Sequence, residues 1–215
     1  MVDAIRARGV RDRRVLDAMR SVPRHWFVSG AGVDEAYEPR ALTTSAGLAL
    51  PEPHLIATRL EGLELRGDER VLEVGTGSVY ETALLAKLAK QVYSLDASAE
   101  VCARARELLD RLGYTNVEVI EEDGLKGWSP AAPYRAILVA AGATHVPAAL
   151  VEQLDEEGRL VIPIGDDEQQ LVNRLRKRGL SVETETLTWC RLPPLSGGPR
   201  RRPSWPWAQV ARERS

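Results

Sequence analysis

The chain has 215 residues, 44% of them hydrophobic, and a formal net charge of −2 at pH 7. This length suits one large domain or a domain with a small appendage, and the apolar fraction is enough for a sizeable core. The nearly balanced charge gives no reason to expect nucleic acid or a membrane surface as a partner. Cys102 and Cys190 form no CxxC pair. We therefore predict reduced core thiols and no metal site.

The beginning of the chain, MVDAIRARGVRDRR, is charged and lacks the apolar core of a signal peptide. No apolar run approaches the roughly 20 residues that a membrane-spanning helix needs. These two observations lead us to expect a soluble, cytoplasmic protein.

The first 53 residues are predicted to form a helical extension that ends in a loop. Residues 2–24 read as a helix broken near Gly9, followed by a second helix that ends before Pro23. Residues 25–53 contain scattered Gly, Pro, Ser and Thr without a sustained hydrophobic period, which is typical of loops.

From Pro53 to Gly165, predicted helices alternate with short apolar strands. Helices are expected at 53–65, 80–89, 98–113 and 147–154, and strands at 70–75, 91–96, 117–123, 134–142 and 159–165. Ser98 suits the beginning of the third of these helices and Gly113 its end. This alternation predicts an α/β fold with a doubly wound, mostly parallel sheet.

The last third of the chain has a different pattern. Residues 169–192 alternate like two strands joined near Gly179, which predicts an antiparallel hairpin at the edge of the sheet. A polar tail follows at 196–215, with three arginines near Trp205 and Trp207. This composition could suit RNA, but no other basic surface is indicated, so a solvated or loosely docked terminus is favoured. The predicted organisation is an extension (1–53), a main domain (54–195) and this tail.

Three turns at the carboxyl ends of predicted strands carry candidate ligand-binding residues. Ligands of open parallel sheets bind beyond these ends. Gly75 and Gly77 in EVGTGS allow a tight turn and close approach of the backbone to a ligand. Asp96 follows the second strand, where a carboxylate can accept both hydroxyls of a ribose. Asp123 and Gly124 follow the third strand and suit an adenine edge. Together these turns predict a nucleoside cofactor.

The glycine turn also excludes two classes of nucleotide site. A GxGxxG dinucleotide fingerprint would need glycine at position 80, which is Tyr80, and no GK[ST] follows as a P-loop requires. A glycine turn needed only for packing, with Asp96 as a surface residue, is the alternative interpretation.

Motifs across residues 1–195 resemble the protein-L-isoaspartate (D-aspartate) O-methyltransferases. They are RARGVRDRRVLDAMRSVPRHWFV, AYEPRAL, RVLEVGTGS, LGYTNVEVIEEDGLKGW, APYRAILVAAGA and GRLVIPIG. The N-terminal segment and DGLKGW are specific to this branch of the S-adenosylmethionine-dependent methyltransferases. The resemblance implies their seven-stranded fold, S-adenosylmethionine as cofactor, and isoaspartyl-containing proteins or peptides as partners.

The resemblance also implies site residues. Cofactor contacts are implied for Glu73, Gly75, Thr76, Gly77, Ser78, Asp96, Ala97, Asp123 and Gly124, and substrate contacts for Leu50, Pro51, Pro53 and His54. The family reaction methylates the free carboxylate of an isoaspartyl residue, and the ester collapses to a succinimide that can reopen as aspartate. A carboxylate is already ionised at neutral pH, so catalysis depends on positioning and desolvation.

No side chain is therefore assigned a catalytic role. His25, His54 and His145 are expected to have structural or surface roles, with His54 the leading exception because it adjoins the predicted substrate loop at residues 48–53.

Two stretches depart from the family pattern, and in the first of them Leu48 and Ala49 replace the family's glutamine and threonine. The family's Q-T-[IV]-S-x-P is LALPEP here, so Pro51, with neither hydroxyl nor amide hydrogen, replaces a serine implicated in holding the substrate carboxylate. Glu52 follows, and it would repel a carboxylate if it pointed inward. The family's G-T-G-S-G-Y is GTGSVY. Val79 adds backbone strain if this position has positive φ, and only crowding if φ is helical.

We therefore expect an isoaspartyl carboxyl methyltransferase with a divergent site. Whether this divergence weakens methyl transfer is left open by the sequence. One alternative is a repurposed methyltransferase that acts on another acceptor. The other is a non-catalytic relative that retains cofactor binding or acts through protein contacts. The sequence makes no prediction of oligomeric state.

Overall fold

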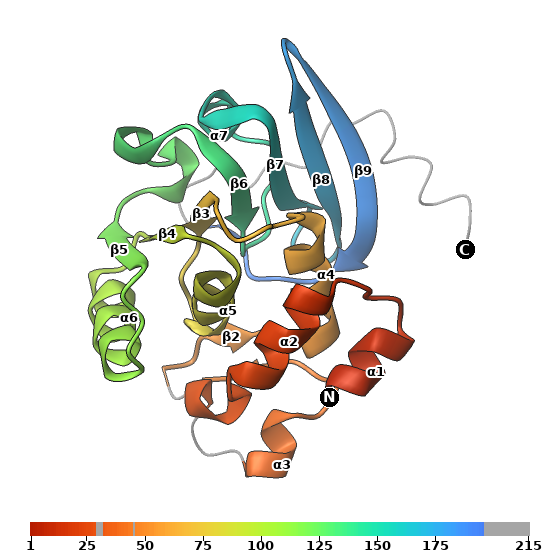
Figure 1. Cartoon of the computed structure of the whole chain (residues 1–215), viewed down its shortest axis with the longest axis vertical. Coiled ribbons are helices and arrows are strands. Elements are labelled where there is room, and N and C mark those ends of the chain that lie inside the picture. Colours follow the sequence, from red (N-terminus) through yellow and green to blue (C-terminus); the bar gives the residue numbers. More distant parts are fainter. Residues whose placement is uncertain (29–31, 45, 196–215) are drawn as a thin grey trace.

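The computed structural model describes residues 1–28, 32–44 and 46–195, and the predicted tail lies outside these residues. Its main sheet has the order β5-β4-β3-β6-β7-β8-β9 (Figure 1). The strands are β3 (Arg70–Val74), β4 (Gln91–Asp96), β5 (Val117–Glu121), β6 (Tyr134–Val139), β7 (Leu154–Gly165), β8 (Gln170–Arg178) and β9 (Ser181–Cys190). The helices are α1 (Val2–Ala7), α2 (Arg13–Ser21), α3 (Val33–Ala36), α4 (Pro53–Gly62), α5 (Tyr80–Leu88), α6 (Ala99–Arg111) and α7 (Ala148–Glu152).

Five adjacent strands, from β5 at one edge through β4, β3 and β6 to β7, run parallel. Val71 of β3 lies opposite Val92 of β4 on one side and Ala136 of β6 on the other. Val71 and its neighbour Leu72 are both fully buried although they point to opposite faces of the sheet. Burial on both faces explains why these strands read as continuous apolar runs. The predicted mostly parallel, seven-stranded sheet is confirmed.

The two faces of the sheet are covered unequally. One face packs against α4, α5 and α6, with α2 packed on α4 and α5, and Leu60, Leu84 and Cys102 lie in the shared core. The other face packs against the short α7 and nearby turns, through residues such as Leu150. In the described part of the chain, no helix is both long and apolar enough to cross a membrane.

The N-terminal extension packs against the main domain rather than standing apart. The predicted break near Gly9 is present, with φ 114° at this glycine, and Ile5 and Met19 enter the same core as α4 and α5. Figure 1 shows α1 and α2 beside α4. The predicted loop contains short elements that periodicity did not indicate: η1 (Arg24–Phe27), α3, and the two-residue strands β1 (Leu42–Thr43) and β2 (Ala49–Leu50). Elements this short carry no hydrophobic period.

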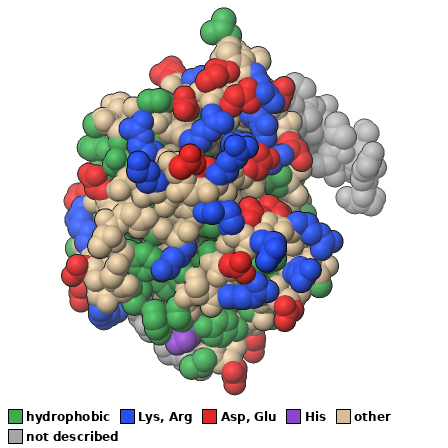
Figure 2. Space-filling view, in the orientation of Figure 1, with side chains coloured by type: hydrophobic (Ala, Val, Ile, Leu, Met, Phe, Trp, Pro, Cys, Tyr) green, Lys and Arg blue, Asp and Glu red, His purple; other side chains and the backbone are tan. Residues whose placement is uncertain are grey.

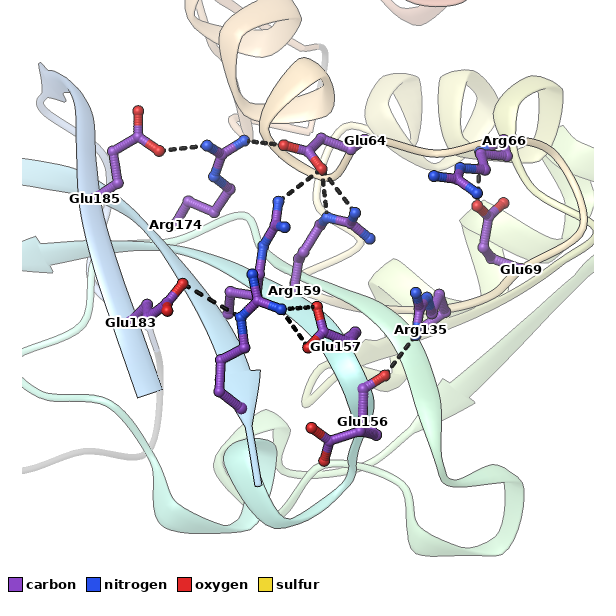
Figure 3. Close-up of polar contacts among 12 residues, drawn as sticks. Glu64, Arg66, Glu69, Arg135, Glu156, Glu157, Arg159, Arg174, Glu183 and Glu185 are labelled. Atoms are coloured by element: carbon purple, nitrogen blue, oxygen red, sulfur yellow. Dashed lines mark hydrogen bonds and ion pairs between the residues drawn. The ribbon is translucent and has the colours of Figure 1, made fainter. Parts of the chain in front are cut away.

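The C-terminal strands form the predicted antiparallel hairpin, with the turn at Gly179. An ion cluster fixes its outer face to the end of α4. Glu64 accepts from Arg159 at 2.7 Å, from Arg174 at 2.5 Å and from Arg176 at 2.8 Å (Figure 3). The hairpin is thereby joined to α4, the helix that follows the substrate loop. Figure 2 shows this face as interspersed basic and acidic side chains.

Candidate active site

The glycine turn follows β3, as predicted, and leads into α5. Gly75 has φ 97° and Gly77 has φ 48°, a region that favours glycine. A Cβ on Gly75 would lie 3.6 Å from the Ala140 side chain, an ordinary contact. Conformation rather than lack of space therefore requires glycine here. The amides of Gly75 and Thr76 both donate to the Leu95 carbonyl, at 2.8 and 3.2 Å, which fixes the turn to the end of β4.

Asp96 lies at the carboxyl end of β4, directly beside this turn. One carboxylate oxygen accepts from the Gly77 amide at 3.3 Å, and the other accepts from the Ser98 amide at 3.0 Å. Each oxygen has a second lone pair. The partly exposed carboxylate is thus held in place with acceptor capacity left for ribose hydroxyls. Ala97, next in the chain, is exposed.

Asp123 and Gly124 follow β5 and begin the short turn η2 (Gly124–Lys126). Asp123 is partly exposed and accepts from the Leu125 amide at 3.0 Å. A Cβ on Gly124 would lie only 2.3 Å from a methyl carbon of Val74. Glycine at 124 is therefore required for η2 to pack against β3.

Four predicted cofactor residues are accessible together at neighbouring strand ends: Gly75, Gly77, Asp96 and Asp123. Bare backbone beside two carboxylates matches what a nucleoside needs, so these residues fit the ribose and adenine of S-adenosylmethionine. Four others, Glu73, Thr76, Ser78 and Gly124, are buried behind this surface.

Glu73, at the end of β3, supports the glycine turn through hydrogen bonds to α5 and β4. It is fully buried, and one carboxyl oxygen accepts from the hydroxyls of Thr82 in α5 and Ser94 in β4, both at 2.6 Å. Its other oxygen has no partner in the described residues. Burial raises the pKa of Glu73 to about 8, so the protonated form predominates at neutral pH. Thr76 joins the same network through a 2.7 Å contact with Ser94.

Val79 has a positive φ, which is the strained one of the two backbone conformations considered above; the other was helical. Its φ is 68° and ψ is −9°, the left-handed region that disfavours a β-branched residue. The side chain is 1% exposed and belongs to the core that also contains Phe27 and Tyr80. The energetic consequence of Val79 is therefore backbone strain at the entrance to α5, with the side chain itself packed in the core.

The substrate loop borders a cavity of about 280 Å³ between the beginning of α4 and the end of β9. Among its lining residues are Arg8, Pro51, Glu52, His54, Trp189 and Arg191. Two of the predicted substrate residues, Pro51 and His54, thus face the cavity. The other two, Leu50 and Pro53, are buried and are not among its lining residues.

Sequence reasoning missed Arg24, which holds the substrate loop. This fully buried side chain donates to the carbonyls of Ala36 and Pro51, both at 2.9 Å, and its guanidinium lies 5.3 Å from the centre of the Tyr80 ring. Burial lowers the pKa of Arg24 to about 10. Arg24 therefore connects the loop at Pro51 to the first residue of α5. No motif or hydrophobic period marks Arg24, so the sequence gives no signal that this side chain is buried.

The histidines have local partners. His25 lies 2.8 Å from the Tyr37 hydroxyl, and His145 lies 3.1 Å from the Thr144 hydroxyl. His54 lies 3.4 Å from the Arg8 carbonyl. Of the three, His54 is the one that borders the substrate cavity.

Comparison with known proteins identifies the family. The family model described as protein-L-isoaspartate(D-aspartate) O-methyltransferase (PCMT) matches residues 1–199. The chain belongs to this family. Proteins named protein-L-isoaspartate O-methyltransferase from Roseiflexus sp. (strain RS-1) and Syntrophus aciditrophicus (strain SB) are 44% and 45% identical to it. Each alignment covers 92% of this chain, and 91% and 92% of the respective relatives.

Solved structures agree with this assignment. A structure named protein-L-isoaspartate O-methyltransferase has a TM-score of 0.83 at 26% identity, covering 92% of this chain. This chain spans 65% of the length of that one. A candidate protein-L-isoaspartate O-methyltransferase from Plasmodium falciparum, in complex with S-adenosyl-L-homocysteine, has a TM-score of 0.78 at 24% identity, covering 92% of this chain and 97% of its own. The predicted methyltransferase fold is confirmed.

Proposed function

We propose that this member of the family transfers a methyl group from S-adenosylmethionine to the free carboxylate of L-isoaspartyl residues. The observation that carries the proposal is the family match over residues 1–199, with relatives of the same name at 42–46% identity over most of the chain. Isoaspartyl-containing proteins or peptides are the partners that this reaction requires. A cytoplasmic location, and the absence of nucleic-acid and membrane partners, stay predictions.

The described residues suit this cofactor. Asp96 would accept the ribose hydroxyls, Asp123 would meet the adenine edge, and the backbone of Gly75 and Gly77 would allow close approach. When bound, S-adenosylmethionine supplies a methyl group whose bond to the sulfonium sulfur breaks as the substrate carboxylate oxygen takes up the methyl carbon.

The protein's part in this reaction is positioning and exclusion of water. The substrate carboxylate is ionised at neutral pH and needs no base. Pro51 presents an apolar wall to the cavity, and Arg24 fixes that wall through the Pro51 carbonyl. Because Pro51 donates no hydrogen bond, the carboxylate must be oriented by other groups, and we expect weaker turnover than a serine would give.

The test is methyl transfer to an isoaspartyl peptide, with the aspartyl peptide of the same sequence as the control. We expect labelled methyl groups on the isoaspartyl peptide alone, and loss of both transfer and S-adenosylhomocysteine binding in Asp96→Ala. Binding of S-adenosylhomocysteine without transfer would favour a different acceptor. Absence of both would favour a non-catalytic relative.

A further inference from the structure

The substrate cavity contains a carboxylate of its own. Glu52 lines the cavity next to Pro51, and its side chain is 31% exposed. On the proposed function, the cavity must also admit the carboxylate of an isoaspartyl residue. Two like charges close together, with little water between them, repel each other and weaken binding.

A single cation from a distant segment neutralises Glu52. The guanidinium of Arg8, just after α1, forms an ion pair with the Glu52 carboxylate, and both side chains line the same cavity. The other titratable residues in the lining are His54, Arg191 and Cys190, and burial raises the pKa of the Cys190 thiol to about 11, so this thiol is uncharged at neutral pH. Within residues 1–28, 32–44 and 46–195, Arg191 forms no ion pair. With Glu52 compensated, the cavity keeps the positive charge of Arg191 for an incoming anion.

The backbone on either side of Arg8 is held by contacts other than this ion pair. The Glu61 carboxylate of α4 accepts from the amides of Arg11 and Asp12, at 2.6 and 2.7 Å, which anchors the segment after Arg8. Ile5 and Val10 on either side are each 2% exposed. The charge of Arg8 can therefore be removed without detaching α1 from α4.

We propose that Arg8 is a specificity-determining residue, whose guanidinium cancels the charge of Glu52 so that the cavity accepts a carboxylate. The proposal rests on the proposed function and names the feature that lets this divergent site receive an anionic substrate. The residue that caps the end of α1 would thus have an electrostatic role in substrate binding.

The experiment compares Arg8→Gln, Glu52→Gln and the double variant with the unaltered chain. Arg6→Gln is the matched control, because Arg6 is an exposed arginine of α1 that does not line the cavity. The Kd of an isoaspartyl peptide is measured by calorimetry with saturating S-adenosylhomocysteine, and KM and kcat are measured by methyl transfer. Thermal unfolding monitors the fold of each variant.

We expect Arg8→Gln to raise Kd and KM about tenfold, with a much smaller change in kcat, because an uncompensated Glu52 opposes binding. Glu52→Gln lowers Kd, since it frees the Arg8 charge. The double variant returns to within about twofold of the original Kd. At about 0.5 M salt, the defect of Arg8→Gln shrinks because exposed charges are screened.

Four results would overturn the proposal. If the double variant binds as weakly as Arg8→Gln, Arg8 acts by supporting the structure and not by its charge. If Arg6→Gln weakens binding equally, the effect comes from net charge. If the original chain methylates the peptide and Arg8→Gln has the same Kd, this inference alone fails. If the original chain neither binds nor methylates the peptide, the proposed function fails and this inference with it.

Discussion

Val79 shows how one residue can carry a conformational conflict inside a well-packed core. The left-handed backbone costs an L-residue on the order of 1–2 kcal/mol, and a branched side chain is among the least suited to it. Burial of the same side chain contributes stability of similar size. Backbone strain and side-chain burial oppose each other in valine. Their separate contributions to stability can be measured by comparing substitutions at position 79.

At position 79 we expect glycine to be more stable than alanine, the reverse of the usual order in helices. Both substitutions remove the buried methyl groups, but only Val79→Gly relieves the φ of 68°. The expected difference in free energy of unfolding is about 1 kcal/mol, measured by urea denaturation. Ala83→Gly inside α5 is the control and should destabilise by about 1 kcal/mol. Equal stability of the two position-79 variants would contradict the strain interpretation.

The buried carboxyl group of Glu73 leads to a second prediction at the residue scale, which concerns how stability depends on pH. Burial raises its pKa from 4.5 to about 8, so the folded state binds an extra proton between these values. Stability from this group is therefore present below about pH 4.5, falls as pH rises, and is lost above about pH 8.

Glu73→Gln retains the acceptor for Thr82 and Ser94 but cannot ionise. Its stability should match that of the original chain near pH 5 and exceed it near pH 9. The gap should grow by up to about 1.4 kcal/mol per pH unit within the window. Denaturation at several pH values provides the measurement, and a constant gap would show that Glu73 does not titrate on unfolding.

At the scale of elements, the Glu64 cluster joins α4 to the hairpin whose end borders the proposed substrate cavity. Burial alone would raise the pKa of Glu64, but Arg159, Arg174 and Arg176 outweigh it and hold the pKa below its ordinary value. The carboxylate therefore stabilises the fold above its unfolded-state pKa, and this contribution is lost as pH falls through the lowered value.

Glu64→Gln should lower the free energy of unfolding by about 1 kcal/mol at low ionic strength, because the cluster is partly exposed. The loss should diminish at about 0.5 M salt and also at low pH, where Glu64 itself is protonated. Urea denaturation under these conditions measures it. Glu183→Gln, which removes one exposed contact to Arg178, is the control and should change stability by less. Salt-independent destabilisation by Glu64→Gln would instead indicate lost packing.

At the scale of the whole molecule, the two departures from the family pattern are connected. Pro51 and Val79 are far apart in the sequence, yet Arg24 binds the carbonyl of one and lies over the ring of Tyr80, next to the other. The proposed substrate loop and the proposed cofactor turn therefore share a buried support.

We predict that Pro51→Ser combined with Val79→Gly raises kcat/KM for an isoaspartyl peptide by on the order of tenfold or more. The serine would supply a hydroxyl to the substrate carboxylate, and the glycine would relax the turn. The single variants, measured alongside, test whether the two positions are coupled, which we expect because Arg24 contacts Pro51 and also Tyr80, the neighbour of Val79. An unchanged kcat/KM in the double variant would show that these positions do not limit activity.

The sequence by itself determined the longer elements of the main domain and the positions of the turns proposed to bind the cofactor. Apolar runs and glycine turns are local properties, so β3 to β7, the C-terminal hairpin, and the placement of Gly75, Gly77 and Asp96 at strand ends could be predicted. The tertiary structure decided the rest, because it depends on contacts between distant residues. The sign of φ at Val79, the burial of Arg24 and the pairing of Glu52 with Arg8 arise only when the N-terminal extension packs against α4 and α5.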